Sequence, residues 1–174
     1  IKYRDTDDFT RQFRPGSCFL REDGEVYNAE KCATLATDRP NILLIGDSHA
    51  AQNWLTFSEM FPDANVMQAT ASACRPLLDG PADSKCKELR DWALKELIPE
   101  GNIDAAILDG RWESGDMESL EETIAYLKNY VPRIAVLGPT VEYEGDLPML
   151  LARSEARGDE FDFDTLRIPG RDDV

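Results

Sequence analysis

Residues 41–50 read Asn-Ile-Leu-Leu-Ile-Gly-Asp-Ser-His-Ala, and this stretch decides the fold of the chain. Four consecutive apolar residues, 42–45, lie between Pro40 and Gly46. Such a run predicts a strand buried on both faces, as in a parallel sheet. Apolar residues at helical spacing follow and predict a helix that Pro62 ends: Ala50, Trp54, Leu55, Phe57 and Phe61.

The same alternation of strand and helix continues along the chain. Apolar segments predict further strands over 65–69, 103–108 and 133–138. Amphipathic patterns predict helices over 85–97, where Pro99 and Gly101 close the helix, and over 116–130 and 146–157. Strands alternating with helices indicate an α/β fold, a three-layer α/β/α sandwich built on a parallel sheet. In such sheets functional loops follow the strands, which here selects residues 46–50, 69–76, 109–113 and 138–144.

Composition narrows the classes of partner. The 174 residues contain 34 acidic and 19 basic side chains, a formal net charge of −15. Nucleic acids and anionic lipids both favour a basic surface, so the charge balance argues against binding to either over the whole surface. No apolar run approaches the length of about eighteen residues that a membrane helix needs.

The four cysteines lie at positions 18, 32, 74 and 86. Their spacing does not match a zinc site. Local disulfides Cys18–Cys32 and Cys74–Cys86 are the simplest of the three possible connectivities, and they favour an oxidising compartment. The alternative is four reduced structural thiols in a cytosolic protein.

The sequence divides into three parts. Residues 1–40 are polar and predict an irregular lead-in arm tied down by a disulfide, residues 41–157 form the α/β domain, and residues 158–174 are a polar tail. Because both ends of the chain are abrupt, we expect it to be a fragment of a longer protein, with the tail truncated.

Ser48 is the strongest candidate for chemistry. It lies where a buried strand turns into a helix, so its hydroxyl is expected to be exposed near the positive helix end. Its own N–H can stabilise an oxyanion, Gly46 permits the tight turn, and Asp47 can accept hydrogen bonds from neighbouring loops. The alternative is an ordinary helix cap. Ala50 replaces the last glycine of a Gly-x-Ser-x-Gly elbow.

Four segments, in the order in which they occur along the chain, resemble motifs of a known family. Gly46-Asp47-Ser48-His49, after a hydrophobic strand, resembles the first block of the SGNH (GDSL-like) hydrolases, and the following Ala50 is typical of SGNH domains fused to acyltransferase-3 membrane proteins. The other segments similar to that subgroup are Ser72-Ala73-Cys74-Arg75-Pro76-Leu77, Ile107-Leu108-Asp109-Gly110-Arg111-Trp112 and Val136-Leu137-Gly138-Pro139-Thr140-Val141-Glu142. The resemblance covers about residues 16–157 and implies a flavodoxin-like SGNH fold.

The resemblance implies roles for single residues. Ser48 would be the nucleophile and a backbone oxyanion donor, supported by Asp47. Ser72, Arg111 and Trp112 are candidates for oxyanion or substrate binding. Alternatives remain open, because Arg111 also suits a surface ion pair, and Trp112 suits packing as well as sugar stacking.

The general base is unknown. The family supplies it from a C-terminal Asp-x-x-His, which this chain lacks, and the chain's single histidine is His49. Adjacent residues in a turn diverge, so His49 is a poor partner for Ser48. We therefore expect little or no turnover from the chain as it stands.

The resemblance also implies a setting. An attached or associated membrane acyltransferase would deliver the acyl donor, and a bacterial cell-envelope glycan would accept it, at the periplasmic or extracellular face of a membrane-anchored protein. No metal and no cofactor are expected. The alternatives are a non-catalytic module that binds a glycan or a partner protein, and a free-standing esterase of related fold.

Overall fold

The computed structural model describes residues 6–80, 83–145, 147–158 and 162–169. Contacts between Cα atoms divide the chain into two compact units, Ile1–Leu137 and Gly138–Val174. Residues 41–50 lie in the first unit.

A sheet of five parallel strands forms the centre of the first unit, in the spatial order β1-β3-β2-β4-β5. The strands are β1 (Phe19–Leu20), β2 (Asn41–Gly46), β3 (Asn65–Ala71), β4 (Ala105–Asp109) and β5 (Ile134–Val136). The apolar run of β2 lies at the middle of the sheet, where Leu43 and Leu44 are fully buried. The predicted α/β fold with a parallel sheet is confirmed.

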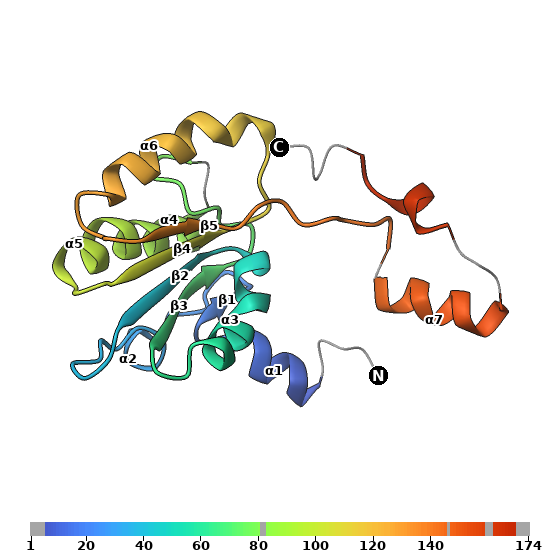
Figure 1. Cartoon of the computed structure of the whole chain (residues 1–174), viewed down its shortest axis with the longest axis horizontal. Helices are drawn as coiled ribbons and strands as arrows, with labels where there is room; N and C mark the ends of the chain where they lie inside the picture. The colour runs from blue at the N-terminus through green and yellow to red at the C-terminus, as the bar shows by residue number, and fades with distance from the viewer. Residues whose placement is uncertain (1–5, 81–82, 146, 159–161, 170–174) are drawn as a thin grey trace. The chain divides into compact units, whose positions relative to one another are not determined.

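Helices cover both faces of this sheet (Figure 1). Helices α1 (Asp7–Phe13) and α3 (Ser48–Met60) lie on one face, and α4 (Ser84–Trp92), α5 (Ile98–Glu100) and α6 (Met117–Leu127) on the other. A short α2 (Ala29–Cys32) and a 3-10 turn, η3 (Ser114–Asp116), also belong to this unit. The layers are those of the predicted α/β/α sandwich.

Register brings three chain segments to one edge of the sheet. Gly46, the last residue of β2, pairs with Thr70 of β3 and with Asp109 of β4. The segments that follow these strands therefore leave the sheet side by side. This is the edge at which parallel sheets place their functional loops.

The prediction of an irregular lead-in arm is wrong in part. Thr6 caps α1, and the rings of Phe9 and Phe13 stack 4.5 Å apart. Further along, β1 adds an edge strand to β3. These elements are too short for periodicity to reveal, and they form because their apolar side chains pack on the rest of the unit.

The predicted end of the helix over 85–97 is also wrong, because Pro99 lies inside a helical turn. A π-helical turn, η2 (Ala93–Leu97), lets the Ile98 N–H donate to the Ala93 carbonyl, and α5 then begins at once. Pro99 occupies the first turn of α5, where a missing N–H costs little. Gly101 follows the true end.

Both predicted disulfides are present. Cys18 is bonded to Cys32 and Cys74 to Cys86, and there are no free cysteines. All four residues are buried. The second disulfide joins Cys74, inside the predicted functional loop 69–76, to Cys86 in the first turn of α4.

The second unit contains α7 (Leu147–Arg157) and a 3-10 turn, η4 (Phe163–Leu166). An antiparallel bridge pairs Tyr143 with Arg167, supported by hydrogen bonds from the Glu144 N–H to the Leu166 carbonyl and from the Ile168 N–H to the Glu142 carbonyl. The predicted loop 138–144 therefore supplies one side of this pairing. Residues 159–161 and 170–174 of the predicted tail lie outside the described residues.

Candidate functional site

Ser48 is the first residue of α3 and is exposed. Its hydroxyl has no hydrogen-bond partner among the described residues. The first turn of a helix carries unpaired N–H groups and a partial positive charge, both of which favour a developing oxyanion. The serine is thus placed where the sequence predicts, with its hydroxyl open to a ligand.

Asp47 precedes the serine and is 2% exposed. One carboxylate oxygen accepts the His49 N–H at 2.8 Å and caps α3, and the other accepts the Arg111 N–H at 2.8 Å. Asp47 therefore binds a neighbouring loop, as the sequence suggests, and joins the start of α3 to the segment after β4. Both oxygens are engaged in holding backbone.

Asp109 ends β4 and is also 2% exposed. Its Oδ2 accepts a hydrogen bond from Asn53 Nδ2 at 2.8 Å, and the same amide group donates to the His49 carbonyl at 3.1 Å. Burial raises the pKa of the Asp109 carboxyl, and the charge of Asp47 raises it further, although the bond from Asn53 opposes the shift. The site thus holds two buried carboxyl groups.

His49 lies beside these carboxyl groups, with a side chain 19% exposed. Its Nδ1 is 3.8 Å from Asp47 Oδ1, and this buried atom has no hydrogen-bond partner. The imidazole thus turns a nitrogen toward Asp47. No grouping of three or more metal-ligating side chains occurs within the described part of the chain.

The three other predicted site residues lie on the two neighbouring loops. Ser72 is half-buried after β3, where its N–H donates to the Leu20 carbonyl at 2.7 Å. Arg111 is exposed, while its backbone is held by Asp47. Trp112 is 3% exposed, and its indole N–H donates to the Leu137 carbonyl at 2.7 Å. Of its two suggested roles, packing fits this burial.

A family model described as "SGNH domain (fused to AT3 domains)" matches residues 17–169. The chain belongs to this SGNH family. No curated protein and no solved structure matches the chain. The parallel sheet flanked by helices agrees with the SGNH hydrolase fold.

In this SGNH domain, as far as its residues are described, no helix is long and apolar enough to cross a membrane. The relatives that define the family are fused to AT3 acyltransferase domains. Two disulfides form readily only under oxidising conditions, so they indicate an extracytoplasmic environment for the domain.

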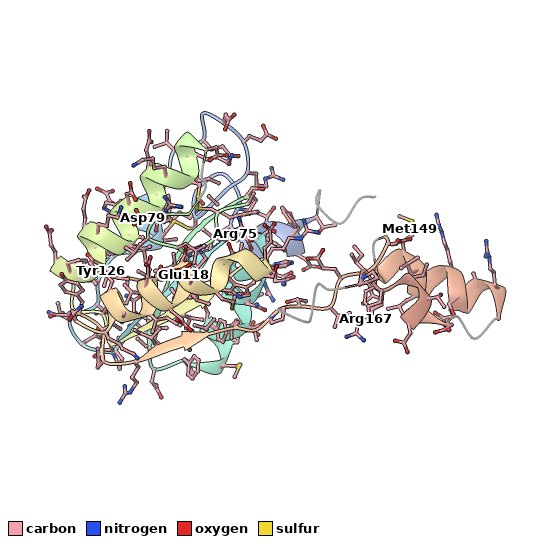
Figure 2. All side chains as sticks on the ribbon, turned by 90° about the horizontal axis from the view of Figure 1, so that it is seen from above. Arg75, Asp79, Glu118, Tyr126, Met149 and Arg167 are labelled. Carbon is pink, nitrogen blue, oxygen red and sulfur yellow. A yellow bond between two sulfur atoms is a disulfide. The ribbon has the colours of Figure 1, made fainter. Side chains whose placement is uncertain are left out.

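Arg75 is a residue that the sequence did not single out as functional. Its guanidinium, labelled in Figure 2, forms ion pairs with Glu113 at 2.9 Å and with Asp116 at 3.0 Å. Because Arg75 follows Cys74, these bonds join the disulfide loop to the loop after β4. A lone arginine in a loop gives no sequence signal of its partners, and only the fold brings them together.

The raised pKa of Asp109 predicts a pH-dependent stability. Between the ordinary value of 3.8 and the raised folded value, the folded state binds more protons than the unfolded state, so stability falls as pH rises through this window. Asp109→Asn removes the charge and keeps an acceptor for Asn53. We expect this variant to match the wild type at pH 3 and to be more stable at pH 7, as measured by urea unfolding.

The control is Asp63→Asn, which changes an exposed carboxylate after α3. For this variant, the difference in unfolding free energy between pH 3 and pH 7 should stay close to that of the wild type. A variant Asp109→Asn that is less stable than the wild type at pH 7 would contradict the pH dependence argued from burial.

Proposed function

We propose that this SGNH domain acts in O-acyl transfer to, or acyl removal from, a bacterial cell-envelope glycan, with Ser48 as the nucleophile. The observation that carries the proposal is the exposed Ser48 at the start of α3, at the functional edge of a sheet in a family fused to AT3 domains. The setting is the periplasmic or extracellular face, and an attached or associated membrane acyltransferase delivers the acyl donor.

The reaction begins when Ser48 Oγ attacks the acyl carbonyl carbon, and the donor's leaving group departs with the electrons of the broken bond. A tetrahedral oxyanion forms on the way to the acyl-enzyme, and the Ser48 N–H and the positive end of α3 stabilise it. A sugar hydroxyl or water then attacks the acyl-enzyme and releases Ser48. The base that accepts the Ser48 proton is not assigned to a residue of this chain.

Two neighbouring residues are proposed to bind substrate. Arg111 is exposed and lies just after β4, where its backbone N–H donates to Asp47. Its cationic side chain suits a carboxylate or an oxyanion. Ser72 is half-buried after β3 and can offer a hydroxyl. Trp112 is buried and anchors the loop through the hydrogen bond from its indole N–H to the Leu137 carbonyl.

A fluorophosphonate probe followed by intact mass spectrometry tests the nucleophile. We expect slow formation of one adduct on the wild type, because no base is assigned to Ser48, and no adduct on Ser48→Ala. Ser58→Ala is the matched control because Ser58 lies on the same helix, where its hydroxyl donates to the Trp54 carbonyl at 2.9 Å; it should label like the wild type. If the wild type takes no adduct, an activated Ser48 is excluded for this chain.

A non-catalytic module that binds a glycan or a partner is the second candidate. The observation that favours it is the placement of the only histidine, whose Nδ1 faces Asp47 while the residue follows Ser48 directly. This candidate predicts no adduct on the wild type together with glycan binding that Ser48→Ala retains, measured by calorimetry with acylated and deacylated envelope oligosaccharides.

A further inference from the structure

Two buried carboxyl groups link the start of α3 to the end of β4. One lies on each element, and each accepts a hydrogen bond from the other side. Asp47, at the start of α3, accepts the Arg111 N–H from the segment after β4. Asp109, at the end of β4, accepts Asn53 Nδ2 from α3. We call these four residues the clasp. Each of the two elements thus supplies one carboxyl acceptor and one donor.

Burying the two carboxyl groups of the clasp costs free energy of folding. Removing a carboxylate from water is unfavourable, and two carboxyl groups close enough to interact add repulsion. Asp109 is 2% exposed, and burial raises its pKa. An apolar side chain of similar size would avoid this penalty, but it would leave the Asn53 amide without one of its two acceptors. The hydrogen bond from Asn53 offsets part of this cost, and its worth lies in what the bond holds in place.

The second bond of Asn53 gives Asp109 a different role. The Asn53 amide also donates to the carbonyl of His49, the residue directly after Ser48. Asp109 fixes the orientation of that amide, and the amide fixes the first turn of α3. The turn carries the Ser48 hydroxyl and the N–H groups that face a developing oxyanion.

We propose that Asp109 and Asn53 are positioning residues for Ser48, which hold the first turn of α3 in place through the hydrogen bond between their side chains. The inference rests on the proposed function of Ser48. Neither residue touches the reacting atoms. Reactive groups need placement to within about 0.5 Å, and a misplacement of about 1 Å can cost on the order of a hundredfold in rate.

Three variants separate positioning from stability. Asp109→Leu keeps the approximate size and removes the acceptor, whereas Asp109→Asn keeps an acceptor for Asn53. Asn53→Asp brings two carboxyl groups together, and combining it with Asp109→Asn restores a carboxyl–amide pair with the partners exchanged. Thermal unfolding followed by circular dichroism shows which variants fold, and Asp109→Asn and the exchanged pair keep the test open if Asp109→Leu does not.

Two readouts are needed. The first is hydrogen exchange by NMR at the Ala51 amide, which donates to the Asp47 carbonyl at 3.0 Å in the first turn, compared with the Phe57 amide near the other end of α3. This readout does not depend on any activity. The second is the rate at which the fluorophosphonate probe labels Ser48.

We expect Asp109→Leu to exchange the Ala51 amide about tenfold faster while Phe57 is unchanged, and to label Ser48 about tenfold more slowly or worse. Asp109→Asn should behave like the wild type in both readouts. Asn53→Asp should resemble Asp109→Leu. The exchanged pair restores the bond between the two side chains but not the donor to the His49 carbonyl, so it should remain slow in labelling and fast in Ala51 exchange.

Unchanged Ala51 exchange in Asp109→Leu overturns the inference, as does faster exchange with an unchanged labelling rate. If the wild type takes no label, the proposed nucleophile fails on its own, and the Ala51 exchange still decides whether Asp109 and Asn53 hold the first turn. The two failures are therefore distinguishable.

Discussion

Gly46→Ala is expected to destabilise the protein by about 4 kcal/mol or more, which places it among the largest effects of single substitutions. Gly46 has a backbone φ of +153°, which side chains rarely tolerate. A Cβ at this position would overlap the Asp109 carbonyl oxygen and would lie 2.9 Å from the Ala50 Cβ. Because the clash is with the backbone of the paired strand β4, no side-chain rotation relieves it.

The measurement is thermal unfolding beside the wild type. For a chain of this size each kcal/mol lowers Tm by about 2–4 °C, so a fall of about 8–16 °C is expected. Gly115→Ala is the matched control, since nothing lies within 4 Å of a Cβ there and its φ is ordinary. A Gly46→Ala protein that unfolds within about 2 °C of the wild type would contradict the close approach of β2 and β4.

Gly46 also shows how much of the fold can be predicted from the sequence. Four apolar residues followed by Gly46 predict a buried strand and a tight turn, and both are confirmed in β2 and α3. The sequence does not reveal that the glycine faces the Asp109 carbonyl, since that contact joins positions 63 residues apart. The local pattern predicts the strand, whereas the register between strands determines which backbone atoms the glycine contacts.

The elements that the sequence misses are short or irregular. The two residues of β1 carry no period of their own, and they become a strand only through pairing with Thr70 and Ala71 of β3. Pro99 is a strong stop signal in isolation, yet the π turn before it changes the pattern of N–H partners. In both cases tertiary or adjacent structure overrides a local rule.

The candidate site divides in the same way. The position of Ser48 follows from the strand–helix turn, which sequence pattern predicts well. Asn53 lies four residues after His49 and so on the same side of α3, but nothing in the sequence pairs its amide with Asp109. Arg75 likewise meets Glu113 and Asp116 only because β3 and β4 end at one edge. Partners contributed by different strands are therefore the part that the sequence could not supply.

Removal of both disulfides is expected to have an effect of similar size. Cys18–Cys32 and Cys74–Cys86 close loops with sequence separations of 14 and 12 residues. In the chain-entropy model each cross-link of this length contributes about 3 kcal/mol, or roughly 6 kcal/mol for two independent loops. A domain of this size is stable by about 5–15 kcal/mol, so the fully reduced chain should be close to unfolding.

The measurement is urea unfolding of the oxidised protein, the protein reduced with dithiothreitol, and the paired variants Cys18→Ala/Cys32→Ala and Cys74→Ala/Cys86→Ala. Each pair should lose about half of the effect of full reduction. Intact mass after alkylation confirms that reduction is complete. A fully reduced protein with an unchanged unfolding midpoint would show that the disulfides do not stabilise the fold and would remove the argument for an oxidising compartment.

The two pairs are expected to differ in their effect on Ser48. Cys18 lies on the β1 side, where its carbonyl accepts the Thr70 N–H at 3.2 Å, whereas Cys74 precedes Arg75 and its ion pairs with the loop after β4. Loss of Cys74–Cys86 should therefore slow labelling of Ser48 at temperatures where the variant remains folded, and loss of Cys18–Cys32 should not. Equal labelling rates in both folded variants would mean that the Arg75 ion pairs hold the loop without the disulfide.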